Sequence, residues 1–519
     1  MTSTMTRTVR RADTTERTYS TLIIGSGFLG LGTAIKLLEA GVEDIVILER
    51  ADAVGGTWRD NTYPGAACDI PSLLYSFSFA QNPTWTRAYS SGAEIRTHIE
   101  HLVTKFDLAR LIRFHAEVDG LVFDENTGVW DVSTSGGPTY RARTVVAASG
   151  PLADSSFPAI RGIDTYTGKK MHSARWDHDY DMAGRHVAVI GTGASGVQII
   201  PELVKTAASV KVFQRTPGWV MPRVDLPIPK LARTVFATVP GAQQAARSAL
   251  FFGHESAATG LVWDSPVTTL IQRLAKVHLR RQVKDPWLRR QLTPDFRAGC
   301  KRMLMSSDYY PALQRENCKL ITWPIATLSP DGIRTSDGVE HRVDCVVFAT
   351  GYDVHLDGPP YPVTGLGGRE LSADWAGHAQ AYKSMSTHGY PNLFFTTGPN
   401  SGPGHNSLLV YAQGQIGYAV RAITTILGQD LRYLDVREDV QHRYNQRLQK
   451  RLARTTWMSG CSSWYLTTDG FNASMFPGFA SQYLRQMKSF RIADYDFPAQ
   501  VADTAVPAQG HESRQQMKP

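Results

Sequence analysis

The 519-residue sequence contains no long apolar run, since no stretch approaches the roughly 20 consecutive apolar residues that a transmembrane helix requires. The opening segment MTSTMTRTVRRADTTER also lacks the apolar core of a secretory signal peptide. We therefore expect a protein without a membrane span or a secretory signal, and we predict a cytoplasmic location.

Cysteine is scarce, with five residues in the whole chain. None of them forms a CxxC pair or belongs to a cluster of potential metal ligands in the sequence. This pattern argues against a disulfide framework, a zinc or other metal site, and a dithiol redox centre. The five are Cys68, Cys300, Cys318, Cys345 and Cys461.

The chain has 55 Lys and Arg residues and 47 Asp and Glu residues, which gives a net charge of +8. This excess of positive charge is small for a chain of this length. Such a charge fits anionic small ligands, and we expect no nucleic-acid partner. Apolar residues make up 42% of the chain and charged residues 20%, so a large folded core is available.

The chain does contain two similar segments, STLIIGSGFLGLGTAIKLLEAG at 20–41 and HVAVIGTGASGVQIIPELVKT at 186–206. Each has an apolar strand, a GxGxxG turn and a helix, which is the setting that makes this motif specific for a dinucleotide. In each turn the first glycine permits the tight bend, the second admits the pyrophosphate, and the third lets the helix approach the strand. We predict an α/β fold with two Rossmann-like units, built on Gly25, Gly27 and Gly30 and on Gly191, Gly193 and Gly196.

The residue that ends the second strand of each unit distinguishes the two ligands. Glu49 follows Gly30 by 19 residues, and a carboxylate there accepts hydrogen bonds from ribose hydroxyls, which suits FAD. Arg215 follows Gly196 by the same distance, with Thr216 beside it, and a guanidinium suits the 2′-phosphate of NADPH. The alternative is that Glu49 and Arg215 merely close the two strands at the surface.

Two dinucleotides on one chain imply electron transfer from the nicotinamide to the flavin. A disulfide reductase would need a cysteine pair near the flavin, but Cys68 stands alone in its part of the sequence. Molecular oxygen or a separate electron acceptor therefore remains as the final oxidant.

Residues 225–300 combine helix-period apolar residues with many basic ones, and they predict a helical insertion in the second unit. Its basic, aromatic-bearing face could contact a membrane surface. A solvated face with a few packing aromatics is the interpretation that we favour.

Three further motifs lie between and after the glycine-rich turns: GGTWRDNTYPGAACD at 55–69, YTGKKMHSARWD at 166–177 and ATGYD at 349–353. With them, the chain resembles the type I Baeyer–Villiger monooxygenases, a branch of the class B flavoprotein monooxygenases, over about residues 19–490. We call the two longer motifs the first and the second fingerprint. The first is carried by Gly56, Thr57, Trp58, Tyr63 and Asp69, which we assign to the cofactor site. The second is carried by Gly168, His172 and Trp176, at the linker between domains.

The resemblance implies roles for individual residues. Arg302 matches the active-site arginine of the family, and Asp69 matches the carboxylate that positions it. Lys301 matches a lysine that helps to bind the NADPH 2′-phosphate, and Trp464 matches a tryptophan on a mobile loop near the nicotinamide. His172 and Trp176 match linker residues whose role is conformational.

The resemblance also implies an FAD-binding domain that an NADPH-binding domain interrupts. We predict the FAD-binding domain at 19–155 and 380–497, and the NADPH-binding domain at 156–379, with a flexible arm at 1–18 and a flexible tail at 498–519.

The function implied is a monooxygenase that uses NADPH and O2 to insert one oxygen atom beside a ketone carbonyl, through a C4a-peroxyflavin, giving an ester or lactone. A cation beside that peroxide would keep it anionic and nucleophilic. One alternative is a monooxygenase that oxygenates sulfur or nitrogen, and another is a non-oxygenating NADPH- and FAD-binding protein or NADPH oxidase. The expected partners are a small-molecule ketone and O2, while the natural ketone and the oligomeric state, a monomer included, remain open.

Overall fold

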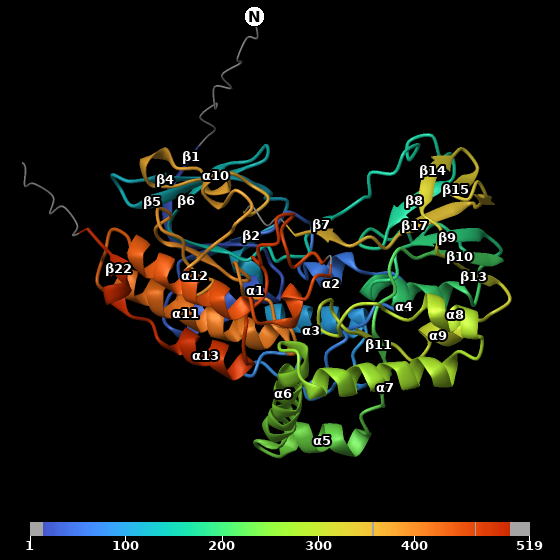
Figure 1. Ribbon diagram of the computed structural model, residues 1–519. Coiled ribbons are helices and arrows are strands. Elements are labelled where there is room, and N and C mark those ends of the chain that lie inside the picture. The colour runs from blue at the N-terminus through green and yellow to red at the C-terminus, as the bar shows by residue number, and fades with distance from the viewer. Residues whose placement is uncertain (1–13, 355–357, 462, 499–519) are drawn as a thin grey trace, which may run out of the picture.

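A computed structural model describes residues 14–354, 358–461 and 463–498 of the protein. The chain forms two lobes, each built around its own β-sheet (Figure 1). The predicted tail from residue 499 onward lies outside the described residues, as do residues 1–13 of the predicted arm.

The first lobe contains a sheet of eight strands among the described residues. Its centre is the apolar segment TLII, where Ile23 lies opposite Ile47 on one side and Val146 on the other, all fully buried. The neighbours β1, β2, β3 and β6 run parallel, whereas β4, β5 and β6 form an antiparallel meander. In spatial order the strands are β19 (Val363–Thr364), β4 (Val118–Asp124), β5 (Val129–Thr134), β6 (Thr139–Ala147), β1 (Thr14–Ile24), β2 (Ile45–Leu48) and β3 (Ile112–Arg113), with β20 (Leu393–Phe395) paired to β6.

The start of β1 corrects the predicted arm of residues 1–18. β1 begins at Thr14, which pairs with Thr139 of β6, so residues 14–18 belong to the sheet. The sequence of this segment is polar and therefore does not indicate a strand. The strand forms because its backbone groups bond to a neighbouring strand, which requires no apolar pattern.

Helices from opposite ends of the chain cover one face of the first sheet. α1 packs against α11, α11 packs against α13, and α3 lies beside α1. Their shared core contains Leu31, Ile416 and Tyr483, each at most 1% exposed. On the other face, apolar side chains of β1 and β2 share a core with side chains of β4 and β5 of the same sheet and with α10. The helices of this lobe are α1 (Phe28–Glu39), α2 (Thr57–Asp60), α3 (Gly92–Lys105), α10 (Leu371–Trp375), α11 (Leu408–Gly428), α12 (Glu438–Leu452) and α13 (Ala480–Lys488).

The second lobe contains a five-stranded sheet in which all described neighbours are parallel. Its central strands are short apolar runs that are buried on both faces, as a parallel sheet between helices requires. Helix α4 (Ala194–Leu203) contains Pro201, which lies in the last turn, and the helix ends two residues later. The strands, in spatial order, are β13 (Cys318–Ile321), β10 (Ser209–Phe213), β9 (His186–Ile190), β17 (Cys345–Phe348) and β8 (Lys169–His172).

The return of the chain to the first lobe occurs earlier than the predicted boundary at residue 380. β19 pairs with β4 of the first sheet, and Leu371 and Trp375 of α10 pack into the core beside that sheet. A pair of two-residue strands, β7 (Asp154–Ser155) and β18 (Tyr352–Asp353), carries the two crossings between lobes side by side. The exact domain limits stay a prediction.

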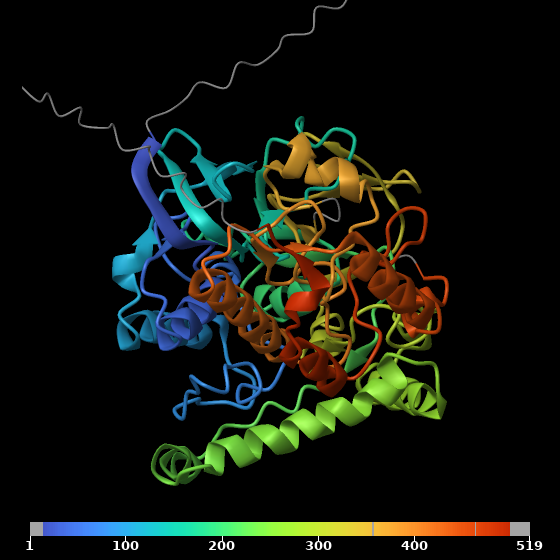
Figure 2. The same cartoon turned by 90° about the vertical axis from the view of Figure 1, so that its left-hand side faces the viewer.

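Four helices fill most of the predicted insertion, and three of them, α5, α6 and α7, lie along the lower edge of the molecule, while α8 lies beside α9 (Figures 1 and 2). They are α5 (Lys230–Thr238), α6 (Ala242–Leu261), α7 (Pro266–Gln282) and α8 (Pro286–Gln291). The remaining elements are α9 (Tyr309–Ala312), the paired β11 (Val220–Met221) and β12 (Leu304–Met305), the meander β14 (Ile325–Ser329), β15 (Gly332–Thr335) and β16 (Glu340–Arg342), and the paired β21 (Asp435–Val436) and β22 (Tyr495–Asp496).

One disulfide contradicts the expectation drawn from the cysteine spacing. Cys300 and Cys461 are bonded, although 161 residues separate them in the sequence, while Cys68, Cys318 and Cys345 are free. Spacing motifs reveal only cysteines that are close in sequence, so they could not indicate this pair. The cytoplasmic location, which rested partly on the cysteine pattern, stays a prediction.

Within the described ranges, none of the helices combines the length and the apolar composition that crossing a lipid bilayer would demand.

Candidate active site

Both glycine-rich turns have the geometry that the motif predicts. Gly25 and Gly191 have φ values of +101° and +108°, which favour glycine. A Cβ on Gly30 would lie 1.9 Å from the Gly25 carbonyl oxygen, and one on Gly196 would lie 2.3 Å from that of Gly191. Any larger third residue would therefore push the helix away from the turn.

The second glycine of each turn opens a helix. Gly27 precedes α1 and Gly193 precedes α4, and neither helix start has a side-chain cap. The first backbone N–H groups of both helices are thus available to an anion, and a Cβ on Gly193 would meet nothing within 4 Å. The uncapped N–H groups of both helices, and the open space beside Gly193, fit the pyrophosphate of a dinucleotide.

Glu49 lies directly after β2 and is 4% exposed. Its carboxylate accepts hydrogen bonds from the Ser26 N–H at 3.0 Å, the Ser26 hydroxyl at 2.6 Å and the Ala51 N–H at 3.0 Å, and it pairs with Arg59 at 2.8 Å. Burial alone would raise the pKa of Glu49, but these donors outweigh it and lower the pKa. Glu49 therefore stays ionised beside the first turn, as an acceptor for ribose hydroxyls must.

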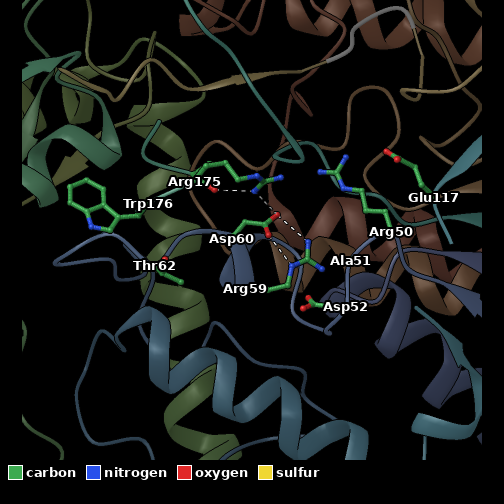
Figure 3. A pocket seen from close by; sticks show the side chains of 10 residues that line it. Arg50, Ala51, Asp52, Arg59, Asp60, Thr62, Glu117, Arg175 and Trp176 are labelled. Atoms are coloured by element: carbon green, nitrogen blue, oxygen red, sulfur yellow. Dashed lines mark hydrogen bonds and ion pairs between the residues drawn. The ribbon is translucent and has the colours of Figure 1, made fainter. Parts of the chain in front are cut away.

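A polar cavity of about 590 Å³ opens beside Glu49, between the end of β2 and the linker after β8. Figure 3 shows Arg59 and Arg175 pointing at Asp60, which they contact at 2.8 Å and 3.2 Å, with Arg50 on the side of Glu117. The location at the carboxyl end of β2 and the polar walls fit the adenosine half of FAD. The cavity is lined by Arg50, Ala51, Asp52, Arg59, Asp60, Thr62, Glu117, Ala174, Arg175 and Trp176.

The other residues of the first fingerprint surround the first turn. Gly56 faces Gly27, since a Cβ on Gly56 would lie 3.4 Å from the Gly27 Cα. Thr57 begins the short helix α2. The Trp58 indole donates to the Tyr75 hydroxyl at 3.0 Å and meets that ring edge to face, so its polar atom is already occupied within the protein.

Tyr63 links the two lobes, while its predicted contact with the cofactor stays a prediction. Its hydroxyl donates to the Gln198 side chain of α4 at 2.9 Å, and the Gln198 amide donates back to the Ala67 carbonyl at 2.9 Å. Gly65 allows this approach, because a Cβ there would lie 2.8 Å from the Gln198 carbonyl oxygen. The YPG sequence therefore fastens the FAD turn to the second glycine-rich helix.

Asp69 and Arg302 form a two-point ion pair. Arg302 donates through Nε and Nη2 to the two carboxylate oxygens, each at 2.8 Å. Burial alone would raise the pKa of Asp69, but the nearby positive charge of Arg302 outweighs burial and lowers that pKa. In turn, the negative charge of Asp69 is the main cause that raises the pKa of Arg302. The Arg302 side chain is still 47% exposed, so its outer face can contact a bound molecule.

Arg215 and Lys301 lie near one another, although 86 positions divide them in the sequence. Burial lowers the pKa of Lys301, and the charge of Arg215 lowers it further, which places the two cations within electrostatic reach. Thr216 is half-buried beside Arg215. Two neighbouring cations that repel each other fit a doubly charged phosphate, as the predicted NADPH site requires.

The second fingerprint builds the linker between lobes. A Cβ on Gly168 would lie 2.3 Å from the Tyr166 hydroxyl, which donates to the Val343 carbonyl. His172 is 1% exposed at the end of β8, and burial lowers its pKa to about 4, so the ring is neutral near pH 7. Trp176 lies in the wall of the polar cavity of Figure 3. These positions agree with conformational roles.

Trp464 lines a second cavity of about 160 Å³, on the sheet of the first lobe. The side chain is 51% exposed, and its ring packs edge to face on Tyr465 at 4.5 Å between centroids. Other walls come from the loop 396–402 that leads to α11 and from the apolar side chains of Trp375 and Phe395. His405, just beyond this loop, has no exposed side-chain surface and contacts Glu255 of α6 at 3.2 Å.

Known proteins resemble the chain over almost its whole length. The family model described as pyridine nucleotide-disulphide oxidoreductase matches residues 22–227. A Baeyer–Villiger monooxygenase of Pseudomonas aeruginosa is 41% identical over 496 residues, covering 95% of this chain and 93% of that protein, and one of Streptomyces coelicolor is 40% identical. The chain belongs to the Baeyer–Villiger monooxygenases.

Solved structures of this class match the fold of the monooxygenase. Cyclohexanone monooxygenase from Rhodococcus sp. Phi1 bound to NADP+ has a TM-score of 0.83 at 27% identity, covering 94% of this chain and 100% of that chain. A steroid monooxygenase bound to NADP has a TM-score of 0.82 at 27% identity, covering 93% of this chain and 100% of that chain. The predicted α/β fold, the monooxygenase activity and the cofactors FAD and NADPH are thereby confirmed.

Sequence reasoning missed three partners at this site. Arg59 lies within the first fingerprint, and its role is visible only from its ion pair with Glu49. Gln198 lies in α4, and its role is visible only from its hydrogen bond with Tyr63. Arg175 is part of the second fingerprint segment, and its ion pair with Asp60 joins the two fingerprints. The alternation of arginines and acids in ERADAVGGTWRD was the one available signal.

Proposed function

We propose that Arg302 is the catalytic cation of this Baeyer–Villiger monooxygenase and that Asp69 holds it in place. The two-point contact between them carries the proposal, because it fixes the direction of a guanidinium that remains half exposed. An arginine keeps its charge in a shielded site, where a lysine can lose its proton.

Bound FAD supplies the activation of O2 with electrons taken from NADPH. The Arg302 guanidinium would stabilise negative charge on the attacking oxygen and on the former carbonyl oxygen of the ketone. Asp69 compensates the guanidinium and prevents it from turning away. Both groups keep the same protonation state throughout the reaction.

We place FAD on the first lobe, with its adenosine half in the 590 Å³ cavity and its ribose hydroxyls on Glu49. NADPH belongs on the second lobe, with its pyrophosphate at Gly193 and its 2′-phosphate between Arg215 and Lys301. The domain limits follow from this placement, with the FAD unit formed by the two segments that build the first sheet.

The ketone is proposed to bind beside the segment that carries Trp464 and Tyr465, because Tyr465 lies within electrostatic reach of Arg302. Trp464 also lines a cavity with Trp375 and Phe395, and these aromatic walls suit an apolar small molecule. Cyclohexanone and steroid monooxygenases are among the similar structures, so cyclic ketones form the first substrate class to test.

The decisive experiment replaces Arg302 by Ala and by Lys. The Ala variant should still pass electrons from NADPH to FAD, while ester formation falls by at least about 100-fold, as for other preorganised charge donors. Flavin absorbance under anaerobic conditions measures the first step, and gas chromatography of the product measures the second. Arg297→Ala, which removes a neighbouring exposed arginine, is the control. Ester formation at a near-normal rate in Arg302→Ala would overturn the assignment.

A further inference from the structure

The disulfide between Cys300 and Cys461 joins the segment that supplies the proposed catalytic arginine to the segment that carries Trp464. Cys300 directly precedes Lys301 and Arg302, and Cys461 precedes Trp464 by three residues. The two Cα atoms are 6.3 Å apart. This cross-link therefore joins the end of the helical insertion to the chain segment at the Trp464 cavity.

The chain segment around Cys300 is closely packed against the end of α6. Cys300 is fully buried, and a Cβ on Gly299, which has a φ of +92°, would lie 2.5 Å from the Leu261 carbonyl oxygen. Thr456 attaches the segment that leads to Cys461 to the same end of α6. Its N–H donates to the Val262 carbonyl at 2.9 Å, and its hydroxyl donates to the Leu261 carbonyl at 2.5 Å.

Beyond Cys461 this anchoring weakens. The described residues of 459–470 form turns and no helix or strand, and Cys461 itself is half-buried. Trp464 is 51% exposed, whereas Tyr465 is 4% exposed and lies within electrostatic reach of Arg302. The disulfide is thus the one covalent tie, among the described residues, between this segment and the arginine.

We propose that the Cys300–Cys461 disulfide is a positioning element of the active site, which holds Trp464 and Tyr465 in register with Arg302 for ketone oxygenation. The proposal rests on the proposed roles of Arg302 and Trp464. A reactive geometry tolerates little displacement, and a shift of about 1 Å can cost about 100-fold in rate. The cross-link removes relative motion that the surrounding turns allow.

Reduction of the disulfide tests this role directly. Dithiothreitol, a dithiol, gives two electrons and two protons: the S–S bond breaks, Cys300 and Cys461 become thiols, and the reagent closes to a cyclic disulfide. The unfolded protein, isolated under non-reducing conditions, should show three free thiols per chain, corresponding to Cys68, Cys318 and Cys345, and five after reduction.

The matched variants are Cys300→Ser with Cys461→Ser as a double change, and Cys318→Ser as the control, since Cys318 is a free, half-buried thiol in β13. In the double variant we expect product formed per NADPH to fall about 10-fold and hydrogen peroxide to rise in its place. The limiting rate of anaerobic FAD reduction at saturating NADPH should fall much less than the product yield, because the ketone takes no part in that step. The control should match the native enzyme in all three measurements.

If the double variant does not fold, the native enzyme treated with dithiothreitol and then reoxidised replaces it, and product yield should fall and recover with the thiol count. Five thiols in the enzyme before reduction, or unchanged product per NADPH after loss of the disulfide, would overturn the proposal. The Arg302→Ala experiment separates the two ideas, because its loss of ester formation would leave the proposed function intact even if the disulfide proved irrelevant.

Discussion

Arg302 donates two hydrogen bonds of 2.8 Å to the two carboxylate oxygens of Asp69, across 233 residues of sequence. Asp69 closes the first fingerprint in the FAD lobe, whereas Arg302 follows the helical insertion of the other lobe. The same pair therefore fixes the direction of a cation and links the two lobes.

Replacing Asp69 by Asn should reduce ketone oxygenation more than FAD reduction. The amide cannot compensate the guanidinium or accept both of its bonds, so Arg302 loses its fixed direction. We expect the rate of ester formation to fall by about 10- to 100-fold, as charged hydrogen bonds are worth about 1.5–3 kcal/mol. Steady-state kinetics with product analysis measures this. Asp264→Asn, which breaks the exposed two-point pair with Arg297, is the control.

Acid pH should remove the contribution of Asp69 to stability. The folded protein holds the pKa of Asp69 below its ordinary value, so the unfolded chain binds the proton more readily. The stabilisation is fully present above the unfolded pKa of about 3.9 and is lost as the pH falls through the lower, folded pKa. Thermal unfolding of the native protein and of Asp69→Asn between pH 7 and pH 3 should give melting temperatures whose difference is constant near neutral pH and narrows as the pH falls below about 3.9. A constant gap across this range would contradict the coupling.

Arg215→Ala should weaken the preference for NADPH over NADH. The 2′-phosphate would lose one of its two proposed cations, which corresponds to about 1.5–3 kcal/mol or about 10- to 100-fold in the ratio of kcat/KM values. Activity with NADH should change little, because NADH has no 2′-phosphate. Arg334→Ala, an exposed arginine of the same lobe that pairs with Glu340, serves as the control. An unchanged cofactor ratio would place the 2′-phosphate elsewhere.

Glu49→Gln should loosen FAD. The neutral amide is a poorer acceptor for ribose hydroxyls, and it leaves the Arg59 guanidinium, which is 12% exposed, without one of its charged partners. We expect the dissociation constant of FAD to rise by about 10-fold or more, measured by recovery of flavin fluorescence on dilution. Glu39→Gln, at the exposed end of α1, should retain FAD like the native enzyme. Equal retention in both variants would remove Glu49 from the FAD site.

The two dinucleotide units could be predicted because their signals are local. A strand, a tight turn and a helix follow one another within about 20 residues, and the glycines at positions such as Gly25 and Gly30 are required by backbone contacts inside that unit. Glu49 and Arg215 could be proposed as cofactor contacts for the same reason, since the length of each unit fixes where its second strand ends; these contacts stay a prediction.

Other relations depended on segments that are distant in sequence. The hydrogen bond from the Tyr63 hydroxyl to Gln198 of the other lobe could not be foreseen, because 135 positions separate the two residues in the sequence. The start of β1 at Thr14 and the pairing of β19 with β4 also depend on partners more than 100 residues away. Cys300 and Cys461 could not be paired from spacing, because a disulfide records proximity in space.

By itself, the sequence determined that this chain binds FAD and NADPH in two repeated units, since each site is specified by hydrogen bonds and close contacts within one short run of residues. Only the tertiary structure decided how the units meet: Asp69 with Arg302, Tyr63 with Gln198, and Cys300 with Cys461. The physical reason is that chain folding brings these side chains together through packing of whole sheets and helices, and no local pattern encodes which surfaces will touch.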